Sequence, residues 1–314
     1  MRQTRFALTV LLVLVALCAV TGPLLSTYYV GLLCQALIFA LFAMSLDILV
    51  GYVGLPSLGH AAFFGVGAYA AGMLTLHFTH SFWWCALAGV GAAVAVGALF
   101  GLLTVRTAGS SFLMITLALA QILWGVAFKW RSLTGGEDGL SGIVRPDLGI
   151  PWDVTSMHSY FYLVLVFFAL CGVGMALFVR SPFGLALQGV RESESRMQAL
   201  GYNVWAYKYL GYLFASAVAG FAGVLYVYYN RFVSPNDLGI ALSAKGLLMV
   251  ILGGTGTLIG PVLGAGVIVV LEHVVSSYTQ RWMMAIGVVY VLVVLFFPKG
   301  VLGALGERVR KGAP

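Results

Sequence analysis

Long segments almost free of charge set the strongest limit on what this chain can fold into. They are Phe6–Leu25, Tyr28–Val50, Phe82–Val105, Ser159–Val179, Tyr209–Tyr229 and Trp282–Phe297. Each is near the ~20 apolar residues that a helix needs to cross the hydrocarbon core of a bilayer. Of the 314 residues, 61% are hydrophobic and 9% are charged, whereas about a quarter of the residues in a soluble domain are charged. The sequence therefore predicts an integral membrane protein.

The expected fold is all-α, a polytopic transmembrane helical bundle that forms a single domain over residues 1–314. Two further helices are predicted at about Ala61–His77 and Phe112–Phe128, and a broken region covers Leu242–Ser276. This gives about eight full spans plus one broken or re-entrant helix pair. The 40 glycines favour close packing between such helices.

The positive charges predict that both termini lie in the cytoplasm. With this orientation, eleven lysines and arginines fall inside and six outside, as the positive-inside rule expects. The inner set is Arg2, Arg5, Arg106, Arg180, Arg191, Arg196, Lys208, Lys299, Arg308, Arg310 and Lys311. The outer set is Lys129, Arg131, Arg145, Arg231, Lys245 and Arg281. The first run, Phe6–Leu25, is longer than the apolar part of a typical signal peptide and is expected to remain as a span.

Two glycine-rich stretches, Gly51–His60 and Gly253–Pro261, interrupt the helical pattern at membrane depth. They free backbone polar groups, which persist in a membrane only inside protein or beside a wet cavity. Broken helices are typical of a transporter's substrate path, although ordinary tight turns remain an alternative. The candidate path residues are Asp47, Ser57, His60, Gly253, Gly254, Thr255 and Gly256.

Charged residues are few within the predicted spans. Asp47 is a functional candidate because an ionisable group in a span is costly, but it could instead reach the interface or pair with a neighbouring helix. Glu272 and His273 are expected near the outer end of their helix. Outside the membrane, Gly135, Gly136 and Asp138 belong to a loop that either contacts a delivered substrate or binding protein, or is simply solvated.

The segment between the sixth and seventh predicted spans, about residues 181–205, carries the most specific pattern. A turn at Pro182 and Gly184 precedes one predicted amphipathic helix, Leu185–Leu200, which Gly201 ends. Its expected packing residues are Leu185, Val190, Met197 and Leu200. Its expected outward-facing residues are Arg191, Glu192, Glu194 and Arg196.

This segment resembles the coupling helix of ABC-importer permeases, which docks on the ATPase subunit. From about Tyr28 to Leu302, the chain resembles the M-type (LivM) permeases of branched-chain amino-acid ABC importers. The similar stretches include Gly51–Gly65, Thr134–Leu140, Arg191–Asn203, Ala219–Gly223, Phe232–Pro235, Leu252–Thr257, Gly260–Pro261 and Pro298–Gly300. Leu55-Pro56 departs from the family, which more often has a polar residue there.

The resemblance implies a non-catalytic permease of the bacterial inner membrane that imports leucine, isoleucine or valine. Its implied partners are a related H-type permease, two ATP-binding subunits, a periplasmic binding protein and membrane lipid. The chain has no GxxxxGK[ST] phosphate loop, so ATP and magnesium are expected on the partner subunits, with no cofactor in this chain. Arg191, Glu192, Glu194, Arg196 and Gly201 are the implied coupling residues.

Other functions remain open at this point. A related permease for urea or short amides is the main alternative within the ABC class. A secondary transporter or channel would need a path of intramembrane charges, and an intramembrane enzyme would need a third partner for Ser57 and His60. No cluster of basic and aromatic residues suggests binding to nucleic acid.

Overall fold

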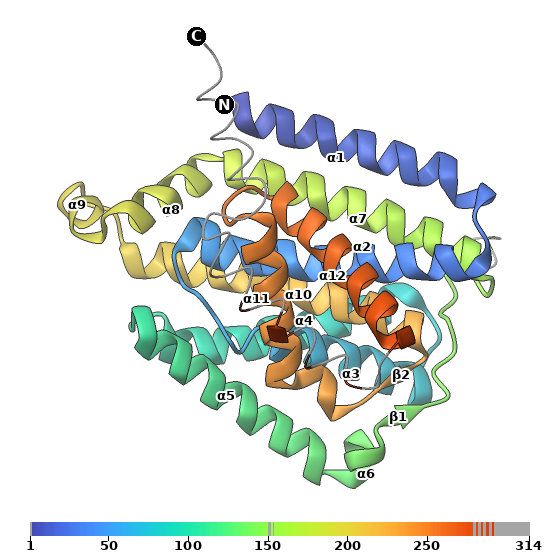
Figure 1. The fold of residues 1–314 in the computed structure, drawn as a ribbon. Coiled ribbons are helices and arrows are strands. Elements are labelled where there is room, and N and C mark those ends of the chain that lie inside the picture. The colour runs from blue at the N-terminus through green and yellow to red at the C-terminus, as the bar shows by residue number, and fades with distance from the viewer. Residues whose placement is uncertain are drawn as a thin grey trace.

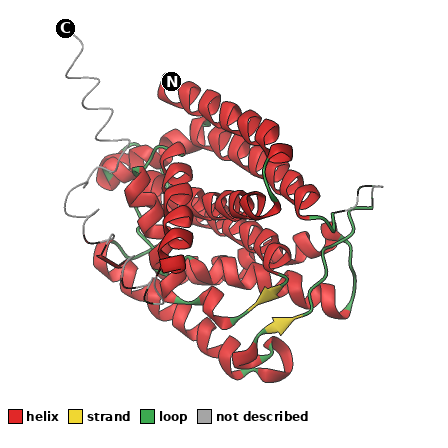
Figure 2. Ribbon diagram, turned by 45° about the vertical axis from the view of Figure 1, so that its right-hand side comes forward, coloured by secondary structure: helices red, strands yellow, loops and turns green. Residues whose placement is uncertain are grey.

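The computed structural model describes residues 2–149, 152, 154–278, 281, 284, 287, 288 and 291. These residues are almost entirely helical, with one pair of two-residue strands among them (Figures 1 and 2). The predicted all-α bundle is therefore confirmed. The last predicted helix, 282–297, and the basic tail after it lie outside the described residues, apart from a few isolated positions.

Seven of the predicted spans are helices in the structure, and two helices occupy the predicted broken region. They are α1 (Arg2–Thr21), α2 (Thr27–Asp47), α3 (Ala61–His77), α4 (Phe82–Thr104), α5 (Gly109–Lys129), α7 (Met157–Arg180), α10 (Val204–Asn230), α11 (Ile240–Gly253) and α12 (Ile259–Tyr278). The short helical elements are η1 (Gly22–Leu24), η2 (Ile48–Val53), α6 (Arg131–Thr134), η3 (Gly136–Asp138), α8 (Pro182–Glu192), α9 (Glu194–Ala199) and η4 (Pro235–Leu238). The strands are β1 (Leu140–Ser141) and β2 (Phe232–Val233).

Six of the described helices are long and apolar enough to cross a membrane: α2 together with η2, then α4, α5, α7, α10 and α12. Apolar side chains such as Leu99, Met114, Ile122, Leu170 and Val267 are exposed on the outer faces of these helices. A helix that is apolar on its exposed face as well as its buried face matches lipid rather than water. Three shorter apolar helices complete the described bundle: Thr9–Leu24, which comprises most of α1 together with η1, then α3 and α11.

Helices α2, α3 and α10 form the centre of the bundle, and α1 and α5 lie on opposite flanks of it (Figure 1). Small residues let the central helices approach closely. A Cβ atom added at Gly67 of α3 would lie 2.7 Å from the Cα atom of Gly220 on α10. Such contacts confirm the close glycine-mediated packing expected from the composition.

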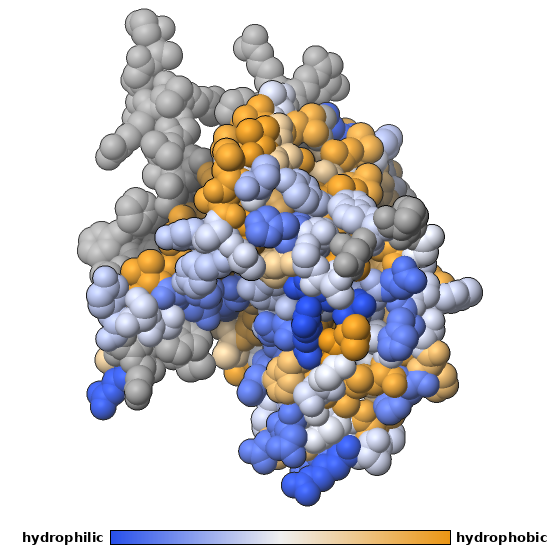
Figure 3. All heavy atoms as spheres, turned by 90° about the vertical axis from the view of Figure 1, so that its right-hand side faces the viewer, coloured by the Kyte–Doolittle hydropathy of each residue, from blue (hydrophilic) through white to orange (hydrophobic). Residues whose placement is uncertain are grey.

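The bundle has two distinct ends. At one end α8 and α9 project beyond the other helices (Figure 1). At the opposite end β1 pairs antiparallel with β2, with Leu140 opposite Val233. Hydrophilic residues are spread over much of this second end, which faces the viewer in Figure 3. Segments predicted to share a membrane face therefore do share an end of the bundle, while the cytoplasmic placement of either end stays a prediction.

Candidate functional site

The first break follows a continuous helix formed by α2 and η2. The η2 segment is a π-helix, a rare form that is often found at functional sites. After it the chain runs without helix until α3 begins at Ala61. Ser57 and His60 are both fully buried here. The hydroxyl of Ser57 accepts a hydrogen bond from the Gly59 N–H (3.2 Å), and His60 Nε2 lies 2.8 Å from the Ser45 hydroxyl.

The second break is shorter than predicted. Helix α11 ends at Gly253, α12 begins at Ile259, and Pro261 lies within the first turn of α12. Proline is tolerated in a first turn because its missing N–H has no helical partner there. Gly253 and Gly254 are buried, whereas Thr255 is exposed.

The two breaks meet, although 205 positions separate Gly51 from Gly256 in the sequence. A Cβ atom at Gly51 would lie 2.6 Å from the Cα atom of Gly256, so only glycine permits this approach of the two backbones. The hydroxyl of Tyr52 donates a hydrogen bond to the Gly256 carbonyl (3.0 Å). We call this contact the Gly51–Gly256 joint.

Asp47, the last residue of α2, stabilises the joint through hydrogen bonds. It is fully buried, and its carboxylate accepts hydrogen bonds from the backbone N–H groups of Gly256 (2.6 Å) and Leu258 (3.4 Å). These N–H groups immediately precede α12. A carboxylate at the start of a helix is favoured by the helix dipole. Of the alternatives left open by the sequence, Asp47 thus joins a neighbouring element instead of reaching the interface.

We expect Asp47→Ala to destabilise the protein because it leaves buried N–H groups without acceptors. The loss should be about 1–3 kcal/mol for each unpaired donor. Thermal unfolding in detergent should show a lower midpoint than for the unchanged protein. Asp138→Ala, which removes an exposed carboxylate at the other end of the bundle, is the matched control and should leave the midpoint unchanged. Equal midpoints for the two variants would contradict the role of Asp47.

The segment between α7 and α10 corrects the prediction of one helix over Leu185–Leu200. It contains α8 and α9, separated at Ser193, whose extended backbone and hydroxyl cap the start of α9. Pro182 is the first residue of α8 rather than part of a preceding turn, and Ser181 caps that helix through the Gly184 N–H. Gly201, with φ of 86°, follows α9 and ends it as predicted.

The packing face of this segment also differs from the prediction. Val190 and Met197 are buried against Val204 of α10 as expected. Leu185 and Leu200 are instead exposed, by 59% and 67%. Leu185 and the buried Val190 both lie on α8, five positions apart, which is about 140° around a helix, so they cannot share one face. The break at Ser193 then separates Met197 and Leu200 from that helix.

Arg191 is exposed, as predicted, but its guanidinium also reaches the joint. Its Nη1 atom donates a hydrogen bond to the Gly51 carbonyl and lies 3.5 Å from where a Cβ atom of Gly256 would be. A guanidinium is favoured at this place because Gly51 belongs to the last turn of the α2–η2 helix, where the dipole is negative. Arg191 therefore connects the α8–α9 segment directly to both helix breaks.

The other predicted coupling residues have different surroundings. Glu194 forms an ion pair with Lys208, which is buried on α10, so Glu194 holds α9 against the bundle. Glu192 and Arg196 are exposed, as predicted, and have no ion pair among the described residues.

The loop at the opposite end is ordered against the bundle. Gly135 and Gly136 connect α6 to η3, and Asp138 is exposed at the end of η3. Arg145 is buried and donates a hydrogen bond to the Thr155 carbonyl (2.7 Å). Gly135, Gly136 and Asp138 do not contact the joint, and their role in receiving a substrate stays a prediction.

Sequence reasoning missed an ion pair between Lys245 of α11 and Glu272 of α12. The sequence predicts Lys245 on the outer side and Glu272 near the outer end of its helix. The Nζ atom of Lys245 instead lies 4.3 Å from the ring centre of Phe39, in the middle of α2, and Glu272 pairs with it there. The two residues are 27 positions apart on either side of the second break. Their meeting depends on how α12 packs against α11, which no local sequence pattern indicated.

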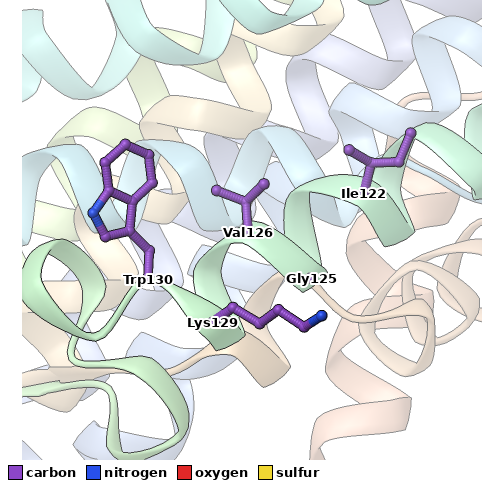
Figure 4. A pocket seen from close by; sticks show the side chains of 5 residues that line it. All are labelled: Ile122, Gly125, Val126, Lys129 and Trp130. Atoms are coloured by element: carbon purple, nitrogen blue, oxygen red, sulfur yellow. The ribbon is translucent and has the colours of Figure 1, made fainter.

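A shallow hollow of about 530 Å³ lies on the outer face of α5, far from these charges in sequence. It is lined by Ile122, Gly125, Val126, Lys129 and Trp130 (Figure 4). It is largely apolar and open, as a lipid-facing surface would be. Among the described residues, no group of histidine, cysteine and acidic side chains could hold a metal ion.

Comparisons with known proteins agree with this architecture. Residues 28–297 match the family described as the permease component of branched-chain amino acid transport systems. The high-affinity branched-chain amino acid permease proteins LivM of Salmonella typhimurium and Escherichia coli K12 are each 30% identical to the chain, over 90% and 93% of its length and 72% and 74% of theirs. The permease protein LivH of Salmonella typhimurium is 24% identical over 84% of the chain and 91% of its own length. No solved structure matches the chain.

Proposed function

Because the chain belongs to the family of permease components of branched-chain amino acid transport systems, we propose that it is the membrane-spanning subunit of an ATP-driven importer for leucine, isoleucine and valine. Such a subunit is not itself catalytic. It provides the path through the cytoplasmic (inner) membrane of a bacterium, with both termini on the cytoplasmic side.

The proposed importer contains further subunits. A second, related permease is supported by the likeness of the chain to both LivM and LivH proteins, two differently named permeases. Two ATP-binding subunits would bind ATP and magnesium, and a periplasmic protein would deliver the amino acid. This chain holds no cofactor in the proposal.

The observation that carries the proposal is the form of the α8–α9 segment. The segment projects from the bundle (Figure 1) and exposes Leu185, Leu200 and Tyr202 beside the charged Glu192. Exposed apolar side chains on a projecting polar segment are typical of a surface that a partner protein covers. Through Arg191, the same segment contacts the joint between the two helix breaks.

This connection supports alternating access as the mechanism. In the proposal, ATP binding closes the ATPase dimer and displaces α8 and α9. Arg191 passes the displacement to the Gly51–Gly256 joint, and Asp47 passes it to the start of α12. The helices that end or begin at the joint then shift together, and the path opens to the other side.

We expect charge reversal at Glu192 to weaken docking of the ATPase. Glu192→Lys should reduce the ATPase recovered with the chain by about five- to tenfold, roughly the effect of one adverse surface charge pair. Insertion into the membrane should be unchanged. Glu137→Lys reverses an exposed charge at the opposite end of the bundle and should not alter recovery. Normal recovery with Glu192→Lys would argue against docking at this surface.

The proposed function as a whole is tested by purifying the chain in mild detergent from its native membrane and identifying the proteins that accompany it. We expect two ATP-binding subunits and a second permease. Recovery of the chain alone, in a form that still transports amino acids, would overturn the proposal and favour a secondary transporter.

A further inference from the structure

The Lys245–Glu272 ion pair lies deep within the length of the bundle. The Nζ atom of Lys245 contacts the ring of Phe39, which is near the midpoint of the 27-residue helix Thr27–Val53. At about 1.5 Å per residue, Phe39 lies roughly 18 Å along the axis from the start of that helix. The pair is therefore far from either interface of a membrane that this helix spans.

The two charged side chains are not sealed inside the chain. Their side chains are 15% and 18% exposed. A charge that faces hydrocarbon is strongly unfavourable, so charged residues in spans face a water-filled cavity or another protein chain. The exposed side of this pair accordingly faces the translocation path or the partner permease.

Further polar groups extend from the pair toward η4 and α3. The ring of Tyr226 lies 5.7 Å from the Phe39 ring, and its hydroxyl faces the carboxylate of Asp237. Tyr69, within electrostatic range of Asp237, has a buried hydroxyl without a hydrogen-bond partner among the described residues. Buried polar groups normally have partners, so the Tyr69 hydroxyl is open to a further polar partner.

We propose that Lys245 and Glu272 bind the carboxylate and the ammonium group of a zwitterionic amino acid during its passage. This assignment rests on the proposed function and narrows its substrate class. When the amino acid binds, each charged side chain exchanges one partner for another of the same sign. No charge is left unpaired at any stage, which is the condition for keeping charges in a buried site.

The aromatic rings beside the pair suit the rest of such a substrate. Phe39, Phe64 and Tyr226 form one cluster, with centroid distances of 5.1–6.2 Å. Phe39 and Phe64 are buried, and the half-buried Tyr226 is the member of the cluster that offers apolar surface to an aliphatic side chain. Urea or a short uncharged amide carries no charges to exchange with the ion pair. The pair therefore distinguishes an amino-acid importer from an importer of uncharged amides.

The test uses two double variants of the whole importer, reconstituted with its binding protein. Lys245→Met with Glu272→Gln removes both charges. Lys245→Glu with Glu272→Lys keeps an ion pair between α11 and α12 but reverses its direction. We expect both to reduce ATP-driven leucine uptake by about tenfold or more, as the loss of a charged contact implies. Subunit composition should stay that of the unchanged importer.

The reversed pair distinguishes a role in binding the substrate from a role in holding α11 against α12. If the pair only holds α11 to α12, reversing it restores uptake, and this result would overturn the assignment. Unchanged uptake in the uncharged double variant would overturn it as well. Val274→Leu, on an exposed position of the same helix, is the control and should not change uptake. Failure of the unchanged importer to take up leucine would instead count against the proposed function itself.

Discussion

Replacing Arg191 with methionine should uncouple ATP hydrolysis from amino-acid uptake while leaving the importer assembled. Methionine keeps most of the length of the side chain but loses the hydrogen bond to the Gly51 carbonyl. A hydrogen bond from a charged group contributes about 1.5–3 kcal/mol, which corresponds to a roughly ten- to hundredfold effect on coupling. We therefore expect uptake per ATP hydrolysed to fall by at least about tenfold.

This prediction is checked by measuring uptake and hydrolysis in the same proteoliposomes. Arg191→Lys should keep part of the coupling because it retains the charge but not the guanidinium geometry. Arg196→Met, the control, removes another arginine from the same segment. Because the connection runs through Arg191, Arg196→Met should lower the uptake-to-hydrolysis ratio much less. An unchanged ratio in the Arg191→Met importer would show that the connection does not transmit motion.

Gly51→Val should damage the protein more than any other single change at the joint. The added side chain would start 2.6 Å from the Gly256 Cα atom, and backbone atoms cannot move away as a flexible side chain could. The two backbones must separate, which also removes the hydrogen bond from the Gly256 N–H to Asp47 and the one from the Tyr52 hydroxyl to the Gly256 carbonyl. Overpacking alone is expected to destabilise by about 1–3 kcal/mol, and each buried group left unpaired adds about as much.

The midpoint of thermal unfolding in detergent and leucine uptake both report this damage. Gly91→Val provides the control because a Cβ atom at Gly91 of α4 meets no other atom within 4 Å. We expect a lower midpoint and no measurable uptake for Gly51→Val, with neither change for Gly91→Val. A stable and active Gly51→Val protein would mean that the joint is not closed in the working importer.

Local features of the fold were predictable because they depend on nearby residues. Helix α3 begins and ends where predicted, at Ala61 and His77, because glycine and proline precede it and its apolar pattern then runs without interruption. Both helix breaks were identified from their glycines. The α8–α9 segment was predicted less well. Its apolar residues follow no single helical face, and this irregularity was a signal of the break at Ser193.

The contacts that connect these features were not predictable from one sequence. Nothing local to Gly51 indicates Gly256 as its neighbour, and nothing local to Arg191 indicates the Gly51 carbonyl. The same limit applies to Lys245, which the charge pattern predicts on the outer side and which the packing of α12 places beside Glu272. Tertiary contacts between distant segments, and not helix boundaries, decide what the candidate site contains.

The most direct test of the central claim is leucine uptake by proteoliposomes that contain this chain with its co-purified subunits and a periplasmic binding protein. The claim is that ATP hydrolysis on partner subunits drives transport through this chain by way of Arg191. We predict uptake against a gradient that requires ATP and is lost with Arg191→Met. Uptake by the purified chain alone, without ATP and unaffected by Arg191→Met, would contradict the account.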